Sequence, residues 1–558
     1  MQRRLPIGIS DFKEIVERDY AYIDKTLLIQ EIYEHGTKVI LMPRPRRFGK
    51  TLNLSMLRYF FEKSAVDHSH LFINFNIWKQ EKYKGLQGQF PLIFLSLKEM
   101  KDADWETAYG KLKLLISDEF ARHYYLLENP ELLPREKLDF QEIIDRIASQ
   151  AIYENSLKML SKLLSQYHKR NVMILIDEYD TPVISSYLNN YYDPMMNFMR
   201  NWLTAALKDN SFLEQGIMTG ILRVAKESFF SGLNNLSTFT ILNETFSSQF
   251  GLLEKEVISL LAEFDLMDCL EEMRKWYNGY RIGSKTLYNP WSILQCIYNK
   301  GQLQPYWVNT SENELLKQLI IQGGEDLKIE LEQILLGQEL EKPFEESLSF
   351  ESLAKGNSEA IWNILLFSGY LTPSGPATYK GIPKCSLKIP NLEIASLYNS
   401  IIREWFTASI QARNFDLLLS SLITGNMETF ISLFEDFLES AMSYYDIGLE
   451  EPEKIYHAFI LGMLISLRDT HEVKSNRESG YGRYDVMLIP KDHDALGNIF
   501  EFKKIRAQEG KDLNSGALSA LQQIEDKNYK HELQERGIRK ILCLGLAFQG
   551  KKVMIKYK

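Results

Sequence analysis

The stretch that decides the fold of this 558-residue chain is Arg44-Pro45-Arg46-Arg47-Phe48-Gly49-Lys50-Thr51. An apolar run, Val39–Met42, precedes it, and a helical pattern, Leu52–Phe61, follows it. Strand, tight loop, Gly-Lys-Thr and helix is the order of a P-loop, in which backbone N–H groups wrap phosphates, the Lys reaches the terminal ones and the Thr hydroxyl ligates Mg²⁺. The first Gly of the usual G-x-x-x-x-G-K-[ST] pattern is absent, because Arg44 stands there. The sequence therefore predicts an altered nucleotide-binding loop, with contacts from Arg46, Arg47, Phe48, Gly49, Lys50 and Thr51.

Asp177 and Glu178 supply the second half of such a site. They end the apolar strand predicted at Val172–Ile176. In this position an Asp holds Mg²⁺ together with the loop Thr51, and a Glu polarises the attacking water. The alternative is a buried strand that ends in acids for no functional reason, but the pairing with a Gly-Lys-Thr loop in the correct order favours the site.

Arg223 is a candidate contact to the terminal phosphate. The predicted strand Gly216–Thr219 is followed by Gly220, Arg223 and Lys226. An Arg after such a strand can stabilise the charge of a transferring phosphoryl group. A surface Arg at the start of a helix explains the pattern equally well. Arg46 and Arg47 also have two possible roles: they either compensate for the missing Gly or simply face solvent.

The order of the predicted elements indicates an α/β fold for the first part of the chain. Strands at Val39–Met42, Leu92–Leu97, Val172–Ile176 and Gly216–Thr219 alternate with helices, which predicts a parallel sheet covered by helices on both faces. Ligands of such sheets lie at the carboxyl ends of the strands. We predict a P-loop NTPase domain over residues 1–250, a mostly helical lid or linker over 251–440, and a compact α/β domain over 441–558.

Composition narrows the class of protein. The chain is 45% hydrophobic and 25% charged with a net charge of -9, and it has four Cys without a C-x-x-C pair. Structural zinc and a disulfide framework are therefore not expected. The N-terminus lacks the apolar core of a secretion signal and no run is long enough to span a membrane. We expect a cytoplasmic protein that does not associate with membranes.

A second constellation lies near the C-terminus. Strands are predicted at Tyr484–Ile489, Asn498–Lys503 and Lys540–Phe548, with a helix at Ser515–Asn528 and a buried apolar helix at Glu453–Leu467. Glu501 and Lys503 share a strand face because side chains alternate along a strand, and Asp485 on the neighbouring strand can meet them. Two converging carboxylates bind a divalent metal and a Lys orients or activates water, which is the chemistry that hydrolyses a phosphodiester. An exposed Glu-x-Lys on an amphipathic strand is the ordinary alternative.

Several residues compete for supporting roles at this second site. Glu478 and Glu453 are candidates for an additional metal ligand, and His457 can join them, although a lone His on an apolar helix is more often a core residue. Gln522 and Gln523 are candidates for substrate contacts. Lys503, Lys504 and Arg506 are expected to contact phosphates.

Together these motifs resemble a bacterial family that couples a predicted AAA-ATPase-like N-terminal domain to a C-terminal nuclease domain of the PD-(D/E)XK superfamily. The stretches that carry the resemblance are Pro6–Phe12, Tyr22–Thr26, Arg44–Thr51, Leu175–Asp180, Thr219–Lys226, Trp276–Tyr280, Tyr288–Ser292, Ser475–Asp485 and Phe500–Lys503. The family's own loop reads R-P-R-R-F-G-K-[ST], so Arg44 is a family feature. The resemblance implies ATP binding by Lys50 and Thr51, with Asp177 and Glu178 as the Walker B pair. It also implies a restriction-endonuclease-like fold with a metal-dependent core at Asp485, Glu501 and Lys503.

The leading hypothesis is an ATP-dependent enzyme in which nucleotide binding gates a nuclease that uses Mg²⁺, or Mn²⁺, to cut DNA. The rival is a nucleotide-regulated module that holds DNA or a protein without cutting, since Tyr456-His457 stand where nucleases of this superfamily often carry an acid. A third hypothesis makes ATP hydrolysis alone the output. The resemblance to AAA-like ATPases also raises a homo-oligomeric ring as an option.

Overall fold

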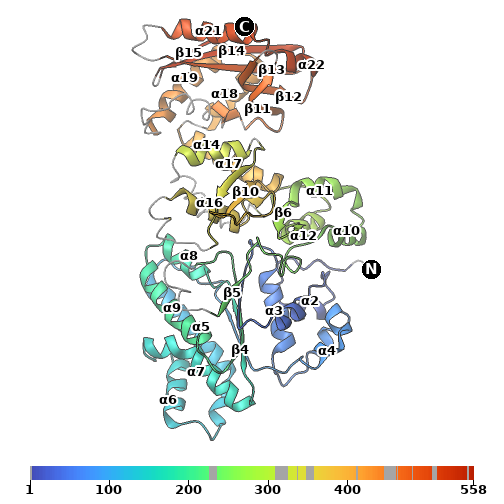
Figure 1. Ribbon diagram of the computed structural model, residues 1–558, viewed down its shortest axis with the longest axis vertical. Coiled ribbons are helices and arrows are strands. Elements are labelled where there is room, and N and C mark those ends of the chain that lie inside the picture. The colour runs from blue at the N-terminus through green and yellow to red at the C-terminus, as the bar shows by residue number, and fades with distance from the viewer. Residues whose placement is uncertain are drawn as a thin grey trace. The chain divides into compact units, whose positions relative to one another are not determined.

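The computed structural model describes residues 3–224, 235–307, 325–335, 337–346, 353, 357–409, 412–444, 460–461, 463–464, 466–479, 482–505, 512–549 and 552–558. The chain forms two compact units (Figure 1). The first unit comprises Met1–Gln322 and Glu341–Ile394, and the second comprises Gly323–Leu340 and Ala395–Lys558. No described helix is long and apolar enough to cross a lipid bilayer.

A five-stranded parallel sheet is the centre of the first unit. Its strands are β1 (Val39–Pro43), β2 (Leu92–Ser96), β3 (Val172–Asp177), β4 (Leu213–Gly220) and β5 (Leu236–Thr238). They lie in the order β2-β3-β4-β1-β5 with every pair parallel. The four strands expected from the sequence are confirmed, and β5 is an addition at the edge. Because β4 lies between β3 and β1, the segments that follow these three strands emerge side by side.

Helices cover both faces of this sheet, as the alternating pattern predicts. Figure 1 shows α2 (Leu27–His35) and α3 (Lys50–Phe61) on one side, and α5 (Trp105–Arg122), α7 (Gln150–His168) and α9 (Tyr192–Leu207) on the other. The remaining helices of this part are α1 (Phe12–Glu17), α4 (Glu81–Lys84), α6 (Pro134–Ile144) and α8 (Thr181–Leu188). Helix α3 buries Leu54, Leu57 and Phe60, so its first turn is fixed at the end of the loop that follows β1.

The first unit continues as a mainly helical region. It contains α10 (Glu254–Glu263), α11 (Leu270–Tyr277), α12 (Pro290–Tyr298), α16 (Ser358–Phe367), the hairpin β6 (Tyr280–Ile282) and β7 (Lys285–Leu287), and a small sheet of β8 (Leu340–Pro343), β10 (Lys384–Lys388) and β9 (Thr372–Pro373). The Asn289 side chain caps α12 by accepting from the N–H groups of Trp291 and Ser292. Ala21, Leu5 and Ile23 from the N-terminal segment pack against the apolar cluster of α10, α11 and α12.

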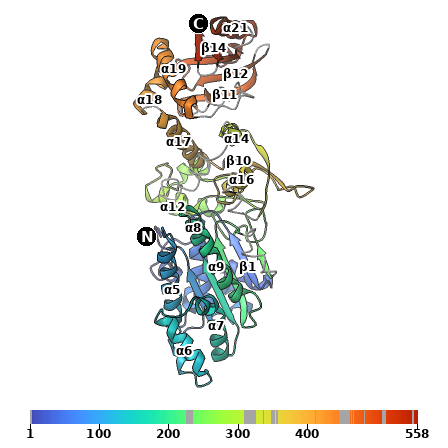
Figure 2. The ribbon, with the colours of Figure 1, turned by 90° about the vertical axis from the view of Figure 1, so that its left-hand side faces the viewer.

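The second unit is a sheet between helices. Strands β11 (His471–Ser479), β12 (Gly482–Pro490), β13 (Leu496–Lys504), β14 (Lys540–Gln549) and β15 (Lys552–Tyr557) lie in that order, with β13 and β14 parallel and the other pairs antiparallel. Helix α21 (Leu513–Asp526) covers one face, and α18 (Ala412–Thr424) and α19 (Met427–Tyr444) cover the other (Figures 1 and 2). Helices α14 (Glu325–Leu335), α17 (Leu392–Ser409) and α22 (His531–Glu535) complete the described elements of this part.

The predicted strands, and the helix that crosses between the two parallel ones, are confirmed here, whereas β11 and β15 were not expected. Of the helix predicted at Glu453–Leu467, residues 453–459 lie outside the described residues. Within the rest of that range, Ile460, Leu461, Met463 and Leu464 are helical and buried.

Glycine lets α21 approach the sheet closely. A Cβ on Gly545 of β14 would lie 2.3 Å from the Ala517 carbonyl oxygen and 2.6 Å from the Leu521 nitrogen, both on α21. Helix backbone cannot yield as a side-chain tip can, so only glycine fits at this position. Gly545 pairs with Glu501 on β13, so the same contact fixes α21 above the acidic residues.

We predict that Gly545→Ala destabilises the second unit by about 3 kcal/mol or more, because overpacking against backbone forces α21 off the sheet. Gly497→Ala is the matched control, since the atoms nearest to its Cβ would be side-chain methyl groups of Leu533 and Ile538, at 3.1 to 3.3 Å. Urea unfolding of the full-length variants measures the difference. Equal losses for the two substitutions would contradict the close approach of α21.

Candidate functional site

The loop between β1 and α3 has the backbone of an anion site. Arg47 and Gly49 adopt positive φ angles of 66° and 84°, which turn the chain sharply into α3. Helix α3 begins at Lys50 and has no acidic residue in its first turn. The first N–H groups of a helix have no acceptor within it, and together with the positive end of the helix dipole they favour an anion at this position.

Lys50 holds the loop in shape from within. Its buried ammonium donates to the carbonyl oxygens of Arg44 at 3.1 Å and Pro45 at 3.2 Å. Burial lowers the pKa of Lys50, and the carboxylates of Glu178, Asp180 and Asp177 oppose that shift. The lysine thus lies between the loop carbonyls and the acids after β3, where a phosphate chain can bind.

Asp177 joins three elements at the bottom of the site. Its Oδ2 accepts from Thr51 Oγ1 and its Oδ1 accepts from Thr219 Oγ1, each at 2.7 Å. Burial raises the pKa of Asp177, and the two threonine hydrogen bonds oppose the rise. A hydroxyl beside a carboxylate is a donor set that fits Mg²⁺ with its water shell. Glu178 follows with a positive φ of 51° and accepts from Thr181 Oγ1 at 3.2 Å.

Arg44 explains why the usual glycine is dispensable here. Its fully buried guanidinium points away from the loop and donates to the carbonyl oxygens of Pro43 at 2.8 Å, Phe239 at 2.5 Å and Phe246 at 3.4 Å. It also lies 5.0 Å from the centre of the Phe250 ring, and burial lowers its pKa to about 9. Only the backbone of Arg44 therefore faces the loop, and its side chain ties β1 to the segment after β5.

The other predicted nucleotide contacts are spread around the loop. Arg46 is close enough to Lys50 for their charges to interact, whereas the Arg47 guanidinium lies 4.3 Å from the centre of the Trp291 ring. Phe48 is buried and packs edge-on against Tyr280 at 5.0 Å. Arg223 forms a long ion pair with Glu346, at 3.8 Å.

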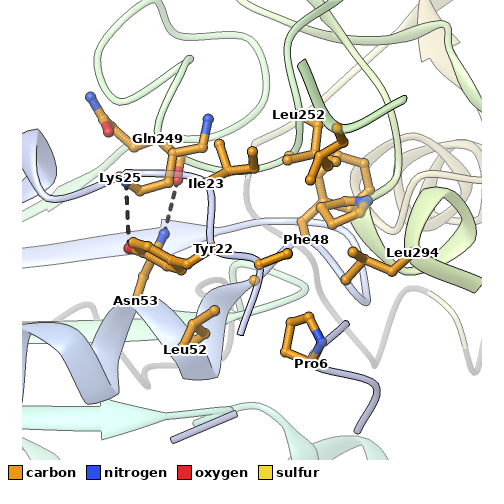
Figure 3. A pocket seen from close by; sticks show the side chains of 15 residues that line it. Pro6, Tyr22, Ile23, Lys25, Phe48, Leu52, Asn53, Gln249, Leu252 and Leu294 are labelled. Carbon is orange, nitrogen blue, oxygen red and sulfur yellow. Dashed lines mark hydrogen bonds between the residues drawn. The ribbon is translucent and has the colours of Figure 1, made fainter. Parts of the chain in front are cut away.

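A cavity of about 90 Å³ opens beside the loop (Figure 3). Its walls come from the N-terminal segment, from Phe48 to Asn53, from the chain after β5 and from α12, and include Pro6, Tyr22, Phe48, Leu52, Leu252 and Leu294. Its polar side chains already have partners. Lys25 donates to both carboxylate oxygens of Glu256 at 2.8 Å, and Asn53 donates to the Gln249 carbonyl oxygen at 2.9 Å. The cavity is therefore an apolar slot, which the sequence alone did not indicate.

In the second unit, the strand register brings the predicted acids together. Val486 pairs with Phe500, so Asp485 lies next to Glu501, and Asp485 Oδ2 accepts from the Phe502 N–H at 2.7 Å. Lys503 Nζ lies 3.5 Å from Glu501 Oε1. Glu501 is 3% exposed, and burial together with Asp485 raises its pKa to about 7. Its Oε2 is buried with no hydrogen-bond partner in the described part of the chain, which suits an oxygen that ligates a cation.

Helix α21 supplies the residue that organises this cluster. Gln523 accepts from Lys503 Nζ at 2.7 Å and donates to Glu501 Oε1 and to the Tyr529 hydroxyl. Gln522, a candidate of equal rank in the sequence, is exposed and donates to Asp526 on its own helix. The orientation of α21 places Gln523, and not Gln522, at the cluster. This orientation depends on where the helix docks on the sheet.

The remaining candidates contribute little to the described geometry. Glu478 lies on β11 opposite Arg483, but its side chain is outside the described part, as are Lys226, Glu453, Tyr456, His457 and Arg506. Among the described residues, no three or more His, Cys, Asp or Glu side chains are grouped so that they could hold a metal ion. Asp485 and Glu501 therefore fit a divalent cation as a pair of carboxylates, with water completing the shell.

Comparison with known proteins agrees with the resemblance drawn from the motifs. Residues 6–230 match the family model described as predicted AAA-ATPase, and residues 451–558 match that described as PD-(D/E)XK nuclease superfamily. A relative from Azotobacter chroococcum mcd 1, named as an uncharacterized protein in the vnfD 5' region, is 28% identical over 568 residues, which cover 98% of this chain and 96% of that protein. The resemblance to an AAA-ATPase-like domain followed by a PD-(D/E)XK nuclease domain is thus confirmed.

We predict that Arg44→Gly, which restores the common P-loop pattern, lowers the unfolding free energy by about 3 kcal/mol or more, because carbonyl groups lose their donors and a cavity opens. Arg47→Gly is the matched control. It removes only an exposed contact to Trp291, worth about 0.5–1 kcal/mol, and places glycine at a positive φ. Thermal unfolding of the full-length protein compares the two. An Arg44→Gly protein as stable as wild type would refute the structural role of Arg44.

We predict that Glu501→Gln stabilises the metal-free protein at pH 8. The folded pKa of about 7 exceeds the ordinary value of 4.5, so the folded state favours the protonated acid. Stability relative to the Gln variant is then lost as pH rises from about 4.5 through about 7, by up to about 3 kcal/mol. Urea unfolding of both proteins between pH 5 and 8 measures this loss, with the exposed Glu535→Gln as control. Parallel pH profiles for wild type and Glu501→Gln would contradict the raised pKa.

Proposed function

We propose that this chain is an ATPase whose nucleotide state controls a divalent-metal-dependent nuclease that acts on DNA. The observation that carries the proposal is that each matched segment contains a lysine ammonium beside buried carboxylates. Lys50 lies beside Asp177 in the first unit, and Lys503 lies beside Glu501 in the second. Such pairs suit the two halves of phosphate chemistry, since the lysine binds the anion and the acids hold a cation or accept a proton.

At the first site, the backbone of loop 44–51 binds the triphosphate. Lys50 exchanges the carbonyl oxygens of Arg44 and Pro45 for phosphate oxygens. Thr51 and Asp177 would hold Mg²⁺, which would offset the negative charge on the phosphates. Glu178 accepts the proton of the attacking water, whose oxygen forms the new bond to phosphorus as the bond to the leaving phosphate breaks.

The apolar cavity beside Phe48 and Gly49 receives the base of the nucleotide. It is continuous with the loop, because the same residues line both. Tyr22, Lys25 and Asn53 are already hydrogen-bonded, so the base binds mainly by apolar contact. Adenine suits this slot better than guanine, since each extra polar group buried without a partner opposes binding.

At the second site, Asp485 and Glu501 would hold Mg²⁺ or Mn²⁺, a cation that would supply Lewis-acid activation of water there. Lys503 orients the attacking water and binds the scissile phosphate, and Gln523 fixes the position of Lys503 through its 2.7 Å hydrogen bond. The pair of carboxylates also supports a second candidate function. With two acids in the described cluster, the nuclease-like unit can hold DNA or a protein without cutting, under the control of nucleotide.

We predict that full-length protein with Mg²⁺ or Mn²⁺ cleaves plasmid DNA and that ATP changes the rate. Asp485→Ala and Lys503→Ala lower cleavage by about 100-fold or more, because metal binding and water activation are lost. Lys540→Ala, at the exposed start of β14 and five positions before Gly545, is the matched control and retains cleavage. Lys50→Ala weakens ATP binding by at least about tenfold and removes the effect of ATP on cleavage. The readouts are gel electrophoresis of the DNA and calorimetric titration of ATP.

DNA binding without cleavage in wild type and variants would instead support the non-cutting module. ATP turnover that Lys50→Ala abolishes, with no effect of DNA and no cleavage, would make ATP hydrolysis the only output. Wild-type protein that binds neither ATP nor DNA would refute both proposals.

A further inference from the structure

The two residues after Glu178 hold the backbone that follows β4. Asp180 Oδ2 accepts from the N–H groups of Ile221 and Leu222, both at 2.8 Å. The Tyr179 hydroxyl donates to the Leu222 carbonyl oxygen at 2.6 Å and accepts from the Val224 N–H at 3.0 Å. These four hydrogen bonds fix the chain immediately before and after position 223, so they set where the side chain of Arg223 emerges.

The two side chains that form these hydrogen bonds are buried, and they pack closely against Gly220. Tyr179 is fully buried and Asp180 is 1% exposed. A Cβ on Gly220 would lie 2.5 Å from Asp180 Oδ1 and 2.8 Å from the Tyr179 ring. Asp180 Oδ1 is buried and has no hydrogen-bond partner among the described residues. A buried carboxylate oxygen without a partner destabilises a fold, so stability alone does not account for this arrangement.

The segment that Tyr179 and Asp180 hold also contacts the loop of residues 44–51. The Arg44 N–H donates to the Gly220 carbonyl oxygen at 3.0 Å, and the Tyr179 N–H donates to the Thr219 carbonyl oxygen at 3.1 Å. Thr219 itself donates to Asp177. Contacts thus run without a gap from the loop and Asp177 to the backbone that carries Arg223.

Arg223 is able to change its partner. Its ion pair with Glu346 is long, at 3.8 Å, and both side chains are about a quarter exposed, at 29% and 25%. Ion pairs of this kind contribute little stability. A phosphate oxygen within reach binds a guanidinium more strongly than such a pair does.

We propose that Tyr179 and Asp180 are positioning residues that hold Arg223 in reach of the terminal phosphate of a bound nucleoside triphosphate. The proposal rests on the proposed ATP binding and adds two residues to it. Tyr179 and Asp180 act on Arg223 through the backbone of residues 221–224. Loss of their hydrogen bonds therefore removes the distinction between triphosphate and diphosphate, while binding of the rest of the nucleotide remains.

The test compares the affinity of full-length variants for ATP and ADP, measured by calorimetry with Mg²⁺, together with kcat and KM for ATP. Arg223→Ala, Asp180→Ala and Tyr179→Phe are each expected to lower the ADP-to-ATP ratio of Kd values by about tenfold, because the Kd for ATP rises, and to lower kcat and raise KM for ATP. The double variant Asp180→Ala with Arg223→Ala should lose no more than either alone, since both act through one contact.

Two controls separate positioning from folding. Asp180→Asn keeps an oxygen that accepts from Ile221 and Leu222, so it should retain the wild-type ADP-to-ATP ratio of Kd values. Tyr191→Phe removes another buried hydroxyl that donates to a backbone carbonyl, that of Asp102 at 2.7 Å, and should change neither ratio nor kcat. Should Asp180→Ala fail to fold, Tyr179→Phe decides, because it removes only one hydroxyl.

Wild-type discrimination in Asp180→Ala, or equal effects of Tyr179→Phe and Tyr191→Phe, would overturn the positioning role and leave the proposed ATP binding intact. Additive losses in the double variant would overturn it as well. Wild-type protein that binds neither ATP nor ADP would refute the proposed function, and this inference would fall with it.

Discussion

The arrangement of the first unit depends on the carboxylate of Asp177. A buried carboxylate is unfavourable unless its oxygens have donors, and here Thr51 from α3 and Thr219 from β4 each satisfy one of them. This requires β4 to lie beside β3 and the loop after β1 to lie beside both, which is the observed strand order. The same interaction that resolves a solvation problem therefore gathers the loop, the acids and the segment of Arg223 at one edge of the sheet.

The second unit solves an analogous problem with a helix. Glu501 is buried next to Asp485, and the like charges oppose ionisation. Lys503 on the same strand and Gln523 on α21 provide the compensating contacts, and Gln523 reaches Glu501 because Gly545 allows α21 to lie against the sheet. In both units a lysine and a neutral polar side chain hold acids that solvent would otherwise have to stabilise.

Much of this could be predicted from the sequence, for reasons that differ between elements. Strands β1 and β3 are apolar runs; Asp177 ends β3, and Lys50 and Thr51 follow β1 within eight residues, so local pattern suffices. Strand β11 reads His-Glu-Val-Lys-Ser-Asn-Arg-Glu-Ser, and β5 has only three residues. Edge strands of this kind carry little apolar periodicity, which explains why neither was expected.

The side-chain roles that escaped prediction involve distant backbone partners. Arg44 meets carbonyl oxygens of residues 239 and 246, and Tyr179 and Asp180 meet the backbone of residues 221 to 224. Every residue carries backbone hydrogen-bonding groups, so the sequence does not indicate which of them will bond to a given side chain. The orientation of Gln523 over Gln522 likewise depends on how α21 docks.

The hydrogen bonds from Lys50 to the carbonyl oxygens of its own loop mean that this loop is preorganised. An incoming ligand replaces two existing acceptors and does not have to order a disordered loop. The conformational entropy of closing this turn is therefore already spent during folding. Affinity at the loop accordingly reflects the exchange of carbonyl oxygens for ligand oxygens around Lys50. The residues that line the neighbouring cavity determine which ligand is recognised.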